Sequence, residues 1–174
     1  MPRLAVTLLV ALLLALAGCV HGDDEAGETT PPPAETQAAA PEGEPGEFLQ
    51  SVIERYFGGR VDAVWKLLHE AHQRAASREA FERCARGALR LAELERVAVD
   101  DVSDEELEVD GKTLPGSIVV SQITLAPRRG GDRVVTDTRR VVAVNGEWRW
   151  LLNAPELAAY EGGGCPRLPL GSTQ

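Results

Sequence analysis

An abrupt change of composition at residue 47 divides this chain of 174 residues and predicts that its folded core lies beyond that point. Residues 20–46 contain no Leu, Ile or aromatic residue, and they carry seven carboxylates and five Pro. Such a segment cannot bury enough apolar surface to offset the entropy of ordering it. We therefore expect a disordered acidic tether over 20–46 and one domain over 47–174. An acidic tail that binds a partner is the alternative role for the tether.

Residues 1–18 have the features of a signal peptide. Arg3 supplies a basic start, and Thr7 is the only polar residue in 4–17. A membrane span needs ~20 apolar residues, so this shorter run fits the core of an export signal that is removed from the mature chain.

The apolar run ends at Leu16-Ala17-Gly18-Cys19, which resembles the lipobox of bacterial lipoproteins. The resemblance implies cleavage before Cys19 and acyl chains such as palmitate on its sulfur and new amino group, which anchor the protein in a membrane. It implies an exported protein on the extracytoplasmic face of the outer or the cytoplasmic membrane. Val20 replaces the Asp that would indicate retention at an inner membrane. The alternative is ordinary secretion, with Cys19 as an unrelated thiol.

Most of the formal net charge of −9 belongs to the tether, because residues 47–174 carry 17 basic and 20 acidic side chains. An unselective nucleic-acid binder gains its affinity from a basic surface. We therefore expect no nucleic-acid partner. An unknown envelope protein, a small ligand and a second copy of the chain are all compatible with this charge.

Hydropathy patterns predict helices first and strands afterwards. Apolar residues at helical spacing predict three short helices. The first ends at Gly58-Gly59, the second extends over 61–72, and the third begins at the N-cap Ser77. Segments rich in Val, Ile, Thr and Trp predict strands over 93–102, 117–126, 133–144 and 147–153. Turns are expected at Asp110-Gly111, Pro115-Gly116 and Asn145-Gly146, and a last short helix over 154–160. This order predicts an α+β fold with an antiparallel sheet.

The order of elements resembles the nuclear transport factor 2-like (cystatin-like) superfamily. The resemblance is carried by Phe48–Phe57, by Gly58-Gly59-Arg60-Val61-Asp62-Ala63-Val64-Trp65 and by Glu147-Trp148-Arg149-Trp150. It covers about 47–165 and implies N-terminal helices packed on a curved, cone-like antiparallel sheet. Enzymes of the superfamily place acid–base residues in the cavity of the cone, but no motif of this chain matches them.

Cys84 and Cys165 are the two cysteines that remain once Cys19 is acylated. An exported protein is in an oxidising compartment, so an even pair predicts a disulfide. The bond would close a loop of about 80 residues, for which the chain-entropy model gives ~4–5 kcal/mol. Two free thiols or a reactive redox pair are the alternatives, although no CxxC motif is present.

His69 and His72 are the candidates for proton transfer or metal binding in the domain. The sequence His69-Glu70-Ala71-His72 is one residue short of the H-E-x-x-H zinc motif, so no metal is expected. His72 lies on the predicted apolar stripe, where it is either a general base facing a cavity or an ordinary residue of the last helical turn. Nucleotide and serine-hydrolase motifs are absent from the sequence, so we expect no cofactor.

A two-residue loop at Asn145-Gly146 predicts the register of the hairpin. Ala143 then lies opposite Trp148, and Val141 opposite Trp150. The same face includes Asp137 and Arg139, which form either one side of a pocket or a half-solvated pair at a sheet edge. The candidate pocket residues are Trp65, His72, Asp137, Arg139, Trp148 and Trp150.

Two functions are compatible with these patterns. The first is a membrane-anchored lipoprotein of the cell envelope whose domain binds a ligand or a partner without catalysis. The second is a small-molecule isomerase, dehydratase or hydrolase that uses the cone cavity, with His72 or Asp137 as the base. The second requires these two side chains to converge in one pocket.

Replacing the candidate lipid-bearing cysteine tests the anchor. A Cys19→Ser protein lacks the acylated sulfur, so we expect it to leave the membrane fraction, whereas the unchanged chain sediments with membranes. Immunoblotting of separated membrane and soluble fractions measures this. Unchanged membrane retention of the variant would show that another anchor exists.

Overall fold

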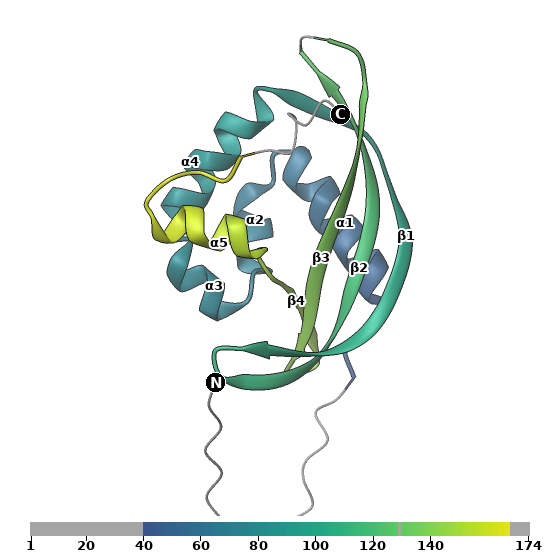
Figure 1. Ribbon diagram of the computed structural model, residues 1–174, viewed down its shortest axis with the longest axis vertical. Helices are drawn as coiled ribbons and strands as arrows, with labels where there is room; N and C mark the ends of the chain where they lie inside the picture. Colours follow the sequence, from purple (N-terminus) through teal and green to yellow (C-terminus); the bar gives the residue numbers. More distant parts are fainter. Residues whose placement is uncertain (1–39, 129, 168–174) are drawn as a thin grey trace, which may run out of the picture. The chain divides into compact units, whose positions relative to one another are not determined.

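The computed structural model describes residues 40–128 and 130–167, so the expectations for the signal peptide, Cys19 and most of the tether lie outside the described residues. The described part contains five helices and four strands, which confirms a mixed α+β fold (Figure 1). In chain order these are α1 (Pro45–Phe57), α2 (Val61–Lys66), α3 (Glu70–Ala75), α4 (Arg78–Leu89), β1 (Ala92–Val109), β2 (Lys112–Pro127), β3 (Arg133–Val144), β4 (Glu147–Trp150) and α5 (Ala154–Glu161).

The first helix begins before the predicted domain boundary. Pro45 and Gly46 are buried at the start of α1. Proline suits this first turn of the helix, where its missing N–H is not needed. The Nε1 atom of Trp148 also donates a hydrogen bond to the carbonyl of Gly43 at 3.0 Å. The folded domain therefore includes the last residues that composition assigns to the tether.

The single helix predicted over 61–72 is wrong, since the chain forms α2 and α3 with a break between them. At the break, Leu68 forms a parallel bridge with Trp150. The amide of His69 donates to the carbonyl of Trp150 at 3.0 Å, and the amide of Trp150 donates to the carbonyl of Leu67 at 3.1 Å. The backbone at 67–69 thus satisfies its hydrogen bonds with β4 instead of with the next helical turn.

Capping residues define the starts of the later helices. The Ser77 side chain accepts a hydrogen bond from the amide of Ala80, which confirms the predicted start of α4. At α5, the Asn153 side chain accepts from the amide of Glu156, while Glu156 accepts from the amide of Asn153. This reciprocal capping box holds the Glu156 side chain in one position.

The four strands form an antiparallel sheet in the order β1-β2-β3-β4. Bulges in β1 between Leu94 and Arg96 and between Val99 and Asp101 bend the strand. The first hairpin turns at Asp110-Gly111, as predicted, but β1 and β2 are longer than expected.

The turn predicted at Pro115-Gly116 is wrong, because these residues lie inside β2. β3 pairs with β2 only from Gly116 onward, so the missing N–H of Pro115 interrupts no hydrogen bond to β3.

The second predicted hairpin is confirmed. Asn145 and Gly146 have φ values of 53° and 79°, as a type I′ turn requires. Val141 pairs with Trp150, and Ala143 pairs with Trp148. The predicted register of this hairpin is therefore correct.

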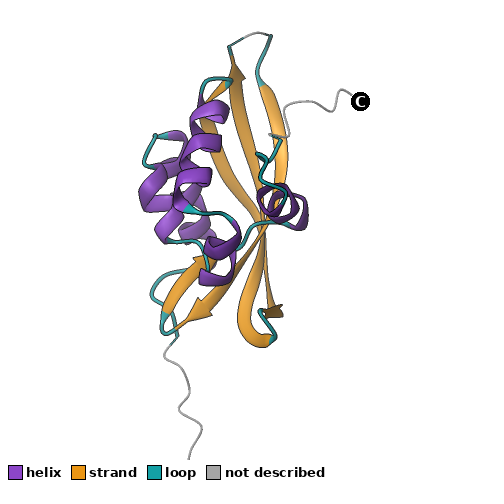
Figure 2. Cartoon of the chain, turned by 90° about the vertical axis from the view of Figure 1, so that its left-hand side faces the viewer, coloured by secondary structure: helices purple, strands orange, loops and turns teal. Residues whose placement is uncertain are grey.

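The main hydrophobic core lies between the helices and the face of the sheet that carries Trp148 and Trp150. Figure 2 views the domain from the helical side, with the helices in front of the strands. Leu49 and Val52 of α1 and Phe81 of α4 share this core with Val119 and Val141 of the sheet. A second, smaller cluster joins the far end of the first hairpin to β3; it comprises Leu107, Val109, Val142 and Leu151, with Ala71 of α3 packed against it.

A disulfide joins Cys84 of α4 to Cys165, which follows α5, and confirms the predicted pairing. The two Cα atoms are 5.3 Å apart across a sequence separation of 81 residues. The bond therefore fastens the C-terminal end of the described domain to its helical layer. Among the described residues, no helix has the length and apolar character needed to cross a membrane.

Gly116 offers a test of this packing, because the backbone approaches it closely. A Cβ atom there would lie 2.4 Å from the carbonyl oxygen of Val141 and 2.8 Å from Cδ1 of Leu107. We expect Gly116→Ala to lower the free energy of unfolding by about 1–3 kcal/mol through overpacking. Urea titration followed by tryptophan fluorescence measures the change.

Gly87→Ala is the matched control, since a Cβ at Gly87 of α4 meets nothing within 4 Å. This variant should raise stability by about 0.5–1 kcal/mol, because alanine favours the helix. Equal stability of Gly116→Ala and the unchanged protein would contradict the close approach at Gly116.

Candidate functional site

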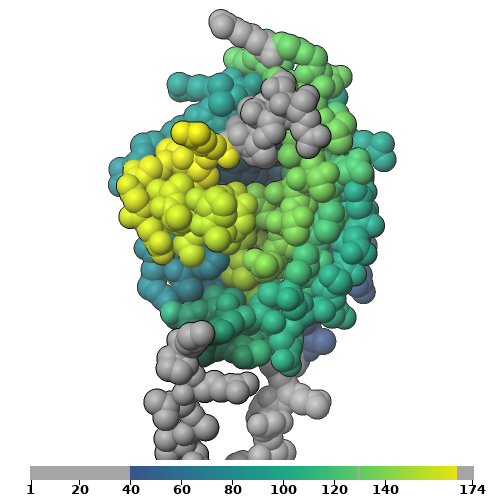
Figure 3. All heavy atoms as spheres, in the orientation of Figure 1, coloured from purple at the N-terminus to yellow at the C-terminus, as the bar shows by residue number. Residues whose placement is uncertain are grey.

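A cavity of about 130 Å³ lies between α1, the strands β2 and β3, and α5. In the space-filling view the cavity is the hollow between α5 and β3, and atoms of α1 form its back wall (Figure 3). Apolar side chains from α1, β2 and β3 form most of its wall, including Leu49, Val52, Ile53, Ile123, Leu125 and Val135. The cavity is thus the part of the main core that side chains leave unfilled.

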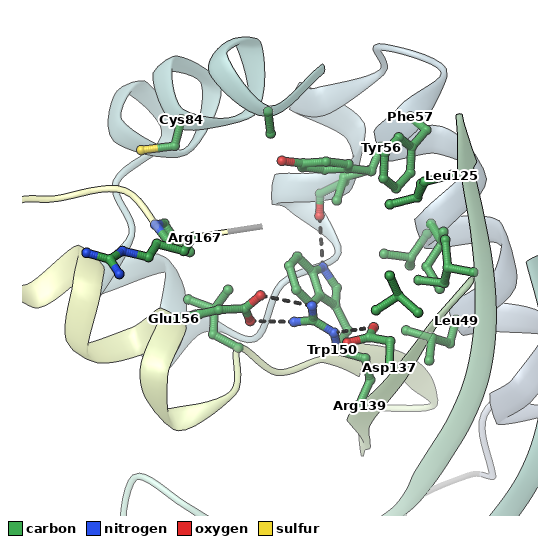
Figure 4. A pocket seen from close by; sticks show the side chains of 18 of the residues that line it. Leu49, Tyr56, Phe57, Cys84, Leu125, Asp137, Arg139, Trp150, Glu156 and Arg167 are labelled. Atoms are coloured by element: carbon green, nitrogen blue, oxygen red, sulfur yellow. Dashed lines mark hydrogen bonds and ion pairs between the residues drawn. The ribbon is translucent and has the colours of Figure 1, made fainter. Parts of the chain in front are cut away.

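Three charged side chains meet at one side of the cavity (Figure 4). The Nε atom of Arg139 donates to Oδ2 of Asp137 at 2.8 Å. Its Nη2 atom donates to Oε1 of Glu156 at 2.8 Å, and Nη1 donates to Oε2 of the same carboxylate. The side chains of Asp137, Arg139 and Glu156 are 13%, 17% and 19% exposed, so this cluster is far less solvated than a sheet-edge ion pair.

Local structure explains how the cluster forms. Alternate residues of a strand face the same side of a sheet, so Val135, Asp137 and Arg139 of β3 all line the cavity. The capping box places Glu156 of α5 opposite them. The guanidinium carbon of Arg139 also lies 5.9 Å from the ring centroid of Trp150, within the range of a cation–π contact.

The guanidinium of Arg139 stays charged despite its burial. Desolvation alone disfavours the cation, but the carboxylates of Glu156 and Asp137 outweigh it and raise the pKa of Arg139 above its ordinary value. Because the fork of the guanidinium is occupied by Glu156 and its Nε by Asp137, Arg139 serves chiefly to hold the two carboxylates in place.

Two phenol rings also contribute polar groups to the cavity lining. The hydroxyl groups of Tyr56 and Tyr160 have no hydrogen-bond partner among the described residues. Burial, followed by the nearby Glu156 carboxylate, raises the pKa of Tyr56 to about 12, and burial likewise raises the pKa of Tyr160. Both phenols are therefore neutral near pH 7, and Figure 4 shows the Tyr56 hydroxyl directed into the cavity.

The structure brings together only part of the predicted pocket. Asp137, Arg139 and Trp150 line the cavity, whereas Trp65, His72 and Trp148 are not among its lining residues. The Nε1 atom of Trp65 in α2 donates to the carbonyl of Ala76, at the end of α3, at 2.8 Å. Trp148 contributes instead to a separate surface depression near Pro41.

The two histidines have structural contacts. His69 caps α3, with its Nδ1 atom accepting from the amide of Ala71 at 3.2 Å. His72 is the third residue of α3 rather than part of the last turn of a longer helix, and its Nδ1 atom accepts from the amide of Leu152 at 2.9 Å. Over residues 40–128 and 130–167, no group of His, Cys, Asp and Glu side chains is arranged to hold a metal ion.

The disulfide borders the cavity. Cys84 lines it, and Pro166 and Arg167, which come directly after Cys165, also contribute to its wall. The bond therefore holds the chain at the cavity rim.

The hydrophobic and hairpin patterns do not identify Tyr56, Glu156 and Tyr160 as site residues. Helical spacing places Tyr56 on the apolar stripe of the first helix and carries no information about its hydroxyl. The spacing of Asn153 and Glu156 is that of a capping box and could have located Glu156 at the start of a helix. No local signal predicts that this glutamate reaches Arg139.

Comparison with protein-family models finds no match to the chain, and comparison with curated proteins finds none either.

The partly buried histidines predict a loss of stability in acid. Burial lowers the pKa of His72, as does the neighbouring His69, and burial lowers the pKa of His69. Below the ordinary value of 6.5, the unfolded chain therefore binds more protons than the folded one, and the free energy of unfolding falls as pH decreases. Urea titrations at several pH values between about 7.5 and 5.5 measure this loss.

His72→Asn should make the loss smaller, because an Asn oxygen can accept the Leu152 amide without titrating. His69→Asn is the parallel variant, since Asn is also a good N-cap residue. If the double variant loses as much stability between these pH values as the unchanged protein, then the histidines do not cause the loss.

Proposed function

We propose that this protein is a cell-envelope lipoprotein whose domain binds a small molecule in the cavity between α1, β3 and α5, without catalysing a reaction. In this proposal, lipid on Cys19 anchors the chain at the extracytoplasmic face of a membrane. The acidic tether then holds the domain in the aqueous phase beside it. The observation that carries the binding role is the cavity itself.

The cavity has the composition typical of a small-molecule site. Such sites are mostly apolar, with a few polar groups that determine the orientation of the ligand. Here the apolar wall comes from α1 and the sheet, and the polar groups are the cluster around Arg139 and the phenols of Tyr56 and Tyr160. The volume of about 130 Å³ is close to that of an apolar cavity of ~150 Å³ that binds benzene, so we take a molecule with a single ring as the size class of the ligand.

The arrangement favours binding over acid–base catalysis. His72 does not line the cavity, and its Nδ1 atom accepts a backbone amide. Asp137 does line the cavity, but one of its oxygens accepts from Arg139 at 2.8 Å. An isomerase, dehydratase or hydrolase would need a base and an acid that converge on the substrate. His72 and Asp137 do not form such a pair.

We also propose that the fold is of the nuclear transport factor 2-like kind, with a curved sheet forming a cone around its helices. The bulges of β1 and the shared core of α1, α4 and the sheet support this proposal. The cavity lies on the helical side of the sheet, where such a cone would enclose it.

The tether limits the distance between the cavity and the membrane. A Gly/Ser-rich coil of the length of residues 20–44 would have a root-mean-square span of roughly 25–30 Å, and the Pro residues and like charges of this segment extend it beyond that value. A domain held at this distance meets molecules that leave or approach the membrane surface.

A cavity-filling substitution tests the binding role. Val135 lines the cavity from β3, so Val135→Phe should occupy the volume and abolish binding. Val134→Phe is the matched control, because Val134 is adjacent in the strand and 64% exposed. The probes are benzylamine, benzyl alcohol and benzoate, and isothermal titration calorimetry on the exported protein in lipid nanodiscs measures binding, with empty nanodiscs as the blank.

We expect at least one probe to bind the unchanged protein and Val134→Phe, and to lose at least about tenfold in affinity for Val135→Phe. The proposal fails if none of the three probes binds, or if Val135→Phe binds as well as its control.

A further inference from the structure

The charges inside the cavity do not balance. Two carboxyl groups, from Asp137 and Glu156, share the single guanidinium of Arg139, which leaves one acidic group in excess. Arg167 also belongs to the wall, but it is exposed, so solvent and salt screen its charge. The side chains of Asp137, Arg139 and Glu156 therefore carry a net charge of −1.

The unused acceptor is an oxygen of Asp137. Oδ2 accepts from Nε of Arg139, whereas Oδ1 has no hydrogen-bond partner among the described residues. Both oxygens of Glu156 are occupied by Arg139, and Oε2 also accepts the amide of Asn153. A ligand that donates hydrogen bonds thus finds a free carboxylate oxygen at Asp137.

A carboxylate ligand is disfavoured by the same geometry. An arginine in a pocket commonly binds an anion in the fork of its guanidinium. Here Glu156 fills that fork, and the capping box holds Glu156 in place. An incoming anion would have to displace this side chain, and it would lie close to two carboxylates in a poorly solvated space.

Aromatic rings supply the remaining attraction for a cation. Tyr56, Phe57, Trp150 and Tyr160 all line the cavity. The face of an aromatic ring attracts a positive charge within about 6 Å, and Trp150 already has the Arg139 guanidinium at 5.9 Å. The structure thus places a cation on an aromatic ring beside the space that a ligand would occupy.

We infer that the cavity selects a small organic monocation, namely a primary amine attached to one apolar ring, with the ammonium group at Asp137 and the ring among the aromatic side chains. This inference rests on the proposed binding function. The amine neutralises the excess carboxylate, and its N–H groups donate to Oδ1 of Asp137 and to the phenol oxygens of Tyr56 and Tyr160.

Three probes of matched size test the charge preference. At neutral pH, benzylamine is a cation, benzyl alcohol is uncharged and benzoate is an anion. We expect benzylamine to bind at least about tenfold more tightly than benzyl alcohol, and benzoate to bind most weakly. Calorimetric titration of each probe into the exported protein in nanodiscs, at fixed low salt, gives the three dissociation constants.

Two variants each remove the excess charge. Asp137→Asn and Glu156→Gln leave one carboxylate for Arg139, so neither creates an unpaired buried charge. The Gln variant also retains the capping-box geometry. In both variants the preference for benzylamine should fall to within about threefold, and if one variant does not fold, the other still provides the test.

Glu147→Gln is the matched control, because the Glu147 side chain is 65% exposed and lies outside the cavity lining. It removes the same charge from the protein and should keep the full preference for the amine. The inference is overturned if benzyl alcohol or benzoate binds as tightly as benzylamine, or if both charge-removing variants keep the preference. In those cases binding itself persists, and the proposed function stands; binding of no probe would overturn both.

Discussion

The hydrogen-bonded contact between Arg139 and two carboxylates joins β3 to α5, two elements that are separated in the sequence. Arg139 and Asp137 belong to β3, whereas Glu156 belongs to α5. Removing Arg139 would leave both carboxylates without a counter-ion, and breaking a buried ion pair in this way typically costs about 3–5 kcal/mol. The position of α5 over the cavity, and hence the cavity wall, depends on this contact.

Trp150 is the second point of convergence. Its backbone pairs with residues 67–69, and its Nε1 atom donates to the carbonyl of Val64 at 3.1 Å. Its ring contacts Phe81 at a centroid distance of 6.0 Å on one side, and the guanidinium of Arg139 lies near it as well. One residue at the end of β4 thus connects the helical layer, the sheet and the charged cluster. The same side chain lines the cavity.

The features that sequence predicts correctly depend on local signals. Asn145-Gly146 determines a hairpin through the conformations that these two residues allow, and the register of Val141 and Trp150 follows from it. Ser77 caps a helix through an oxygen that accepts the amide three residues later. The pairing of Cys84 with Cys165 follows from counting cysteines once Cys19 is set aside.

The features that sequence misses depend on partners distant in the chain. The break after α2 arises because the backbone of Trp150 pairs with residues 67–69, and no pattern within the helix indicates this. Pro115-Gly116 has the composition of a turn, yet Gly116 is needed inside β2 for its close approach to Val141. The meeting of Tyr56, Arg139 and Glu156 likewise requires the packed fold. Individual elements could therefore be predicted, but three of the six residues predicted for the pocket do not line the cavity.

The link between Cys84 and Cys165 has a consequence for when the cavity is complete. A disulfide does not persist in a reducing cytosol. Before oxidation, Pro166 and Arg167 have no covalent attachment to α4, and the wall they contribute is held only by weaker contacts. A chain that acquires this bond outside the cytosol therefore finishes its cavity after leaving the compartment in which it was made. If, as proposed, the chain is exported and its cavity binds a small molecule, cytosolic molecules never meet the mature cavity, and its chemistry need only discriminate among molecules on the far side of the membrane.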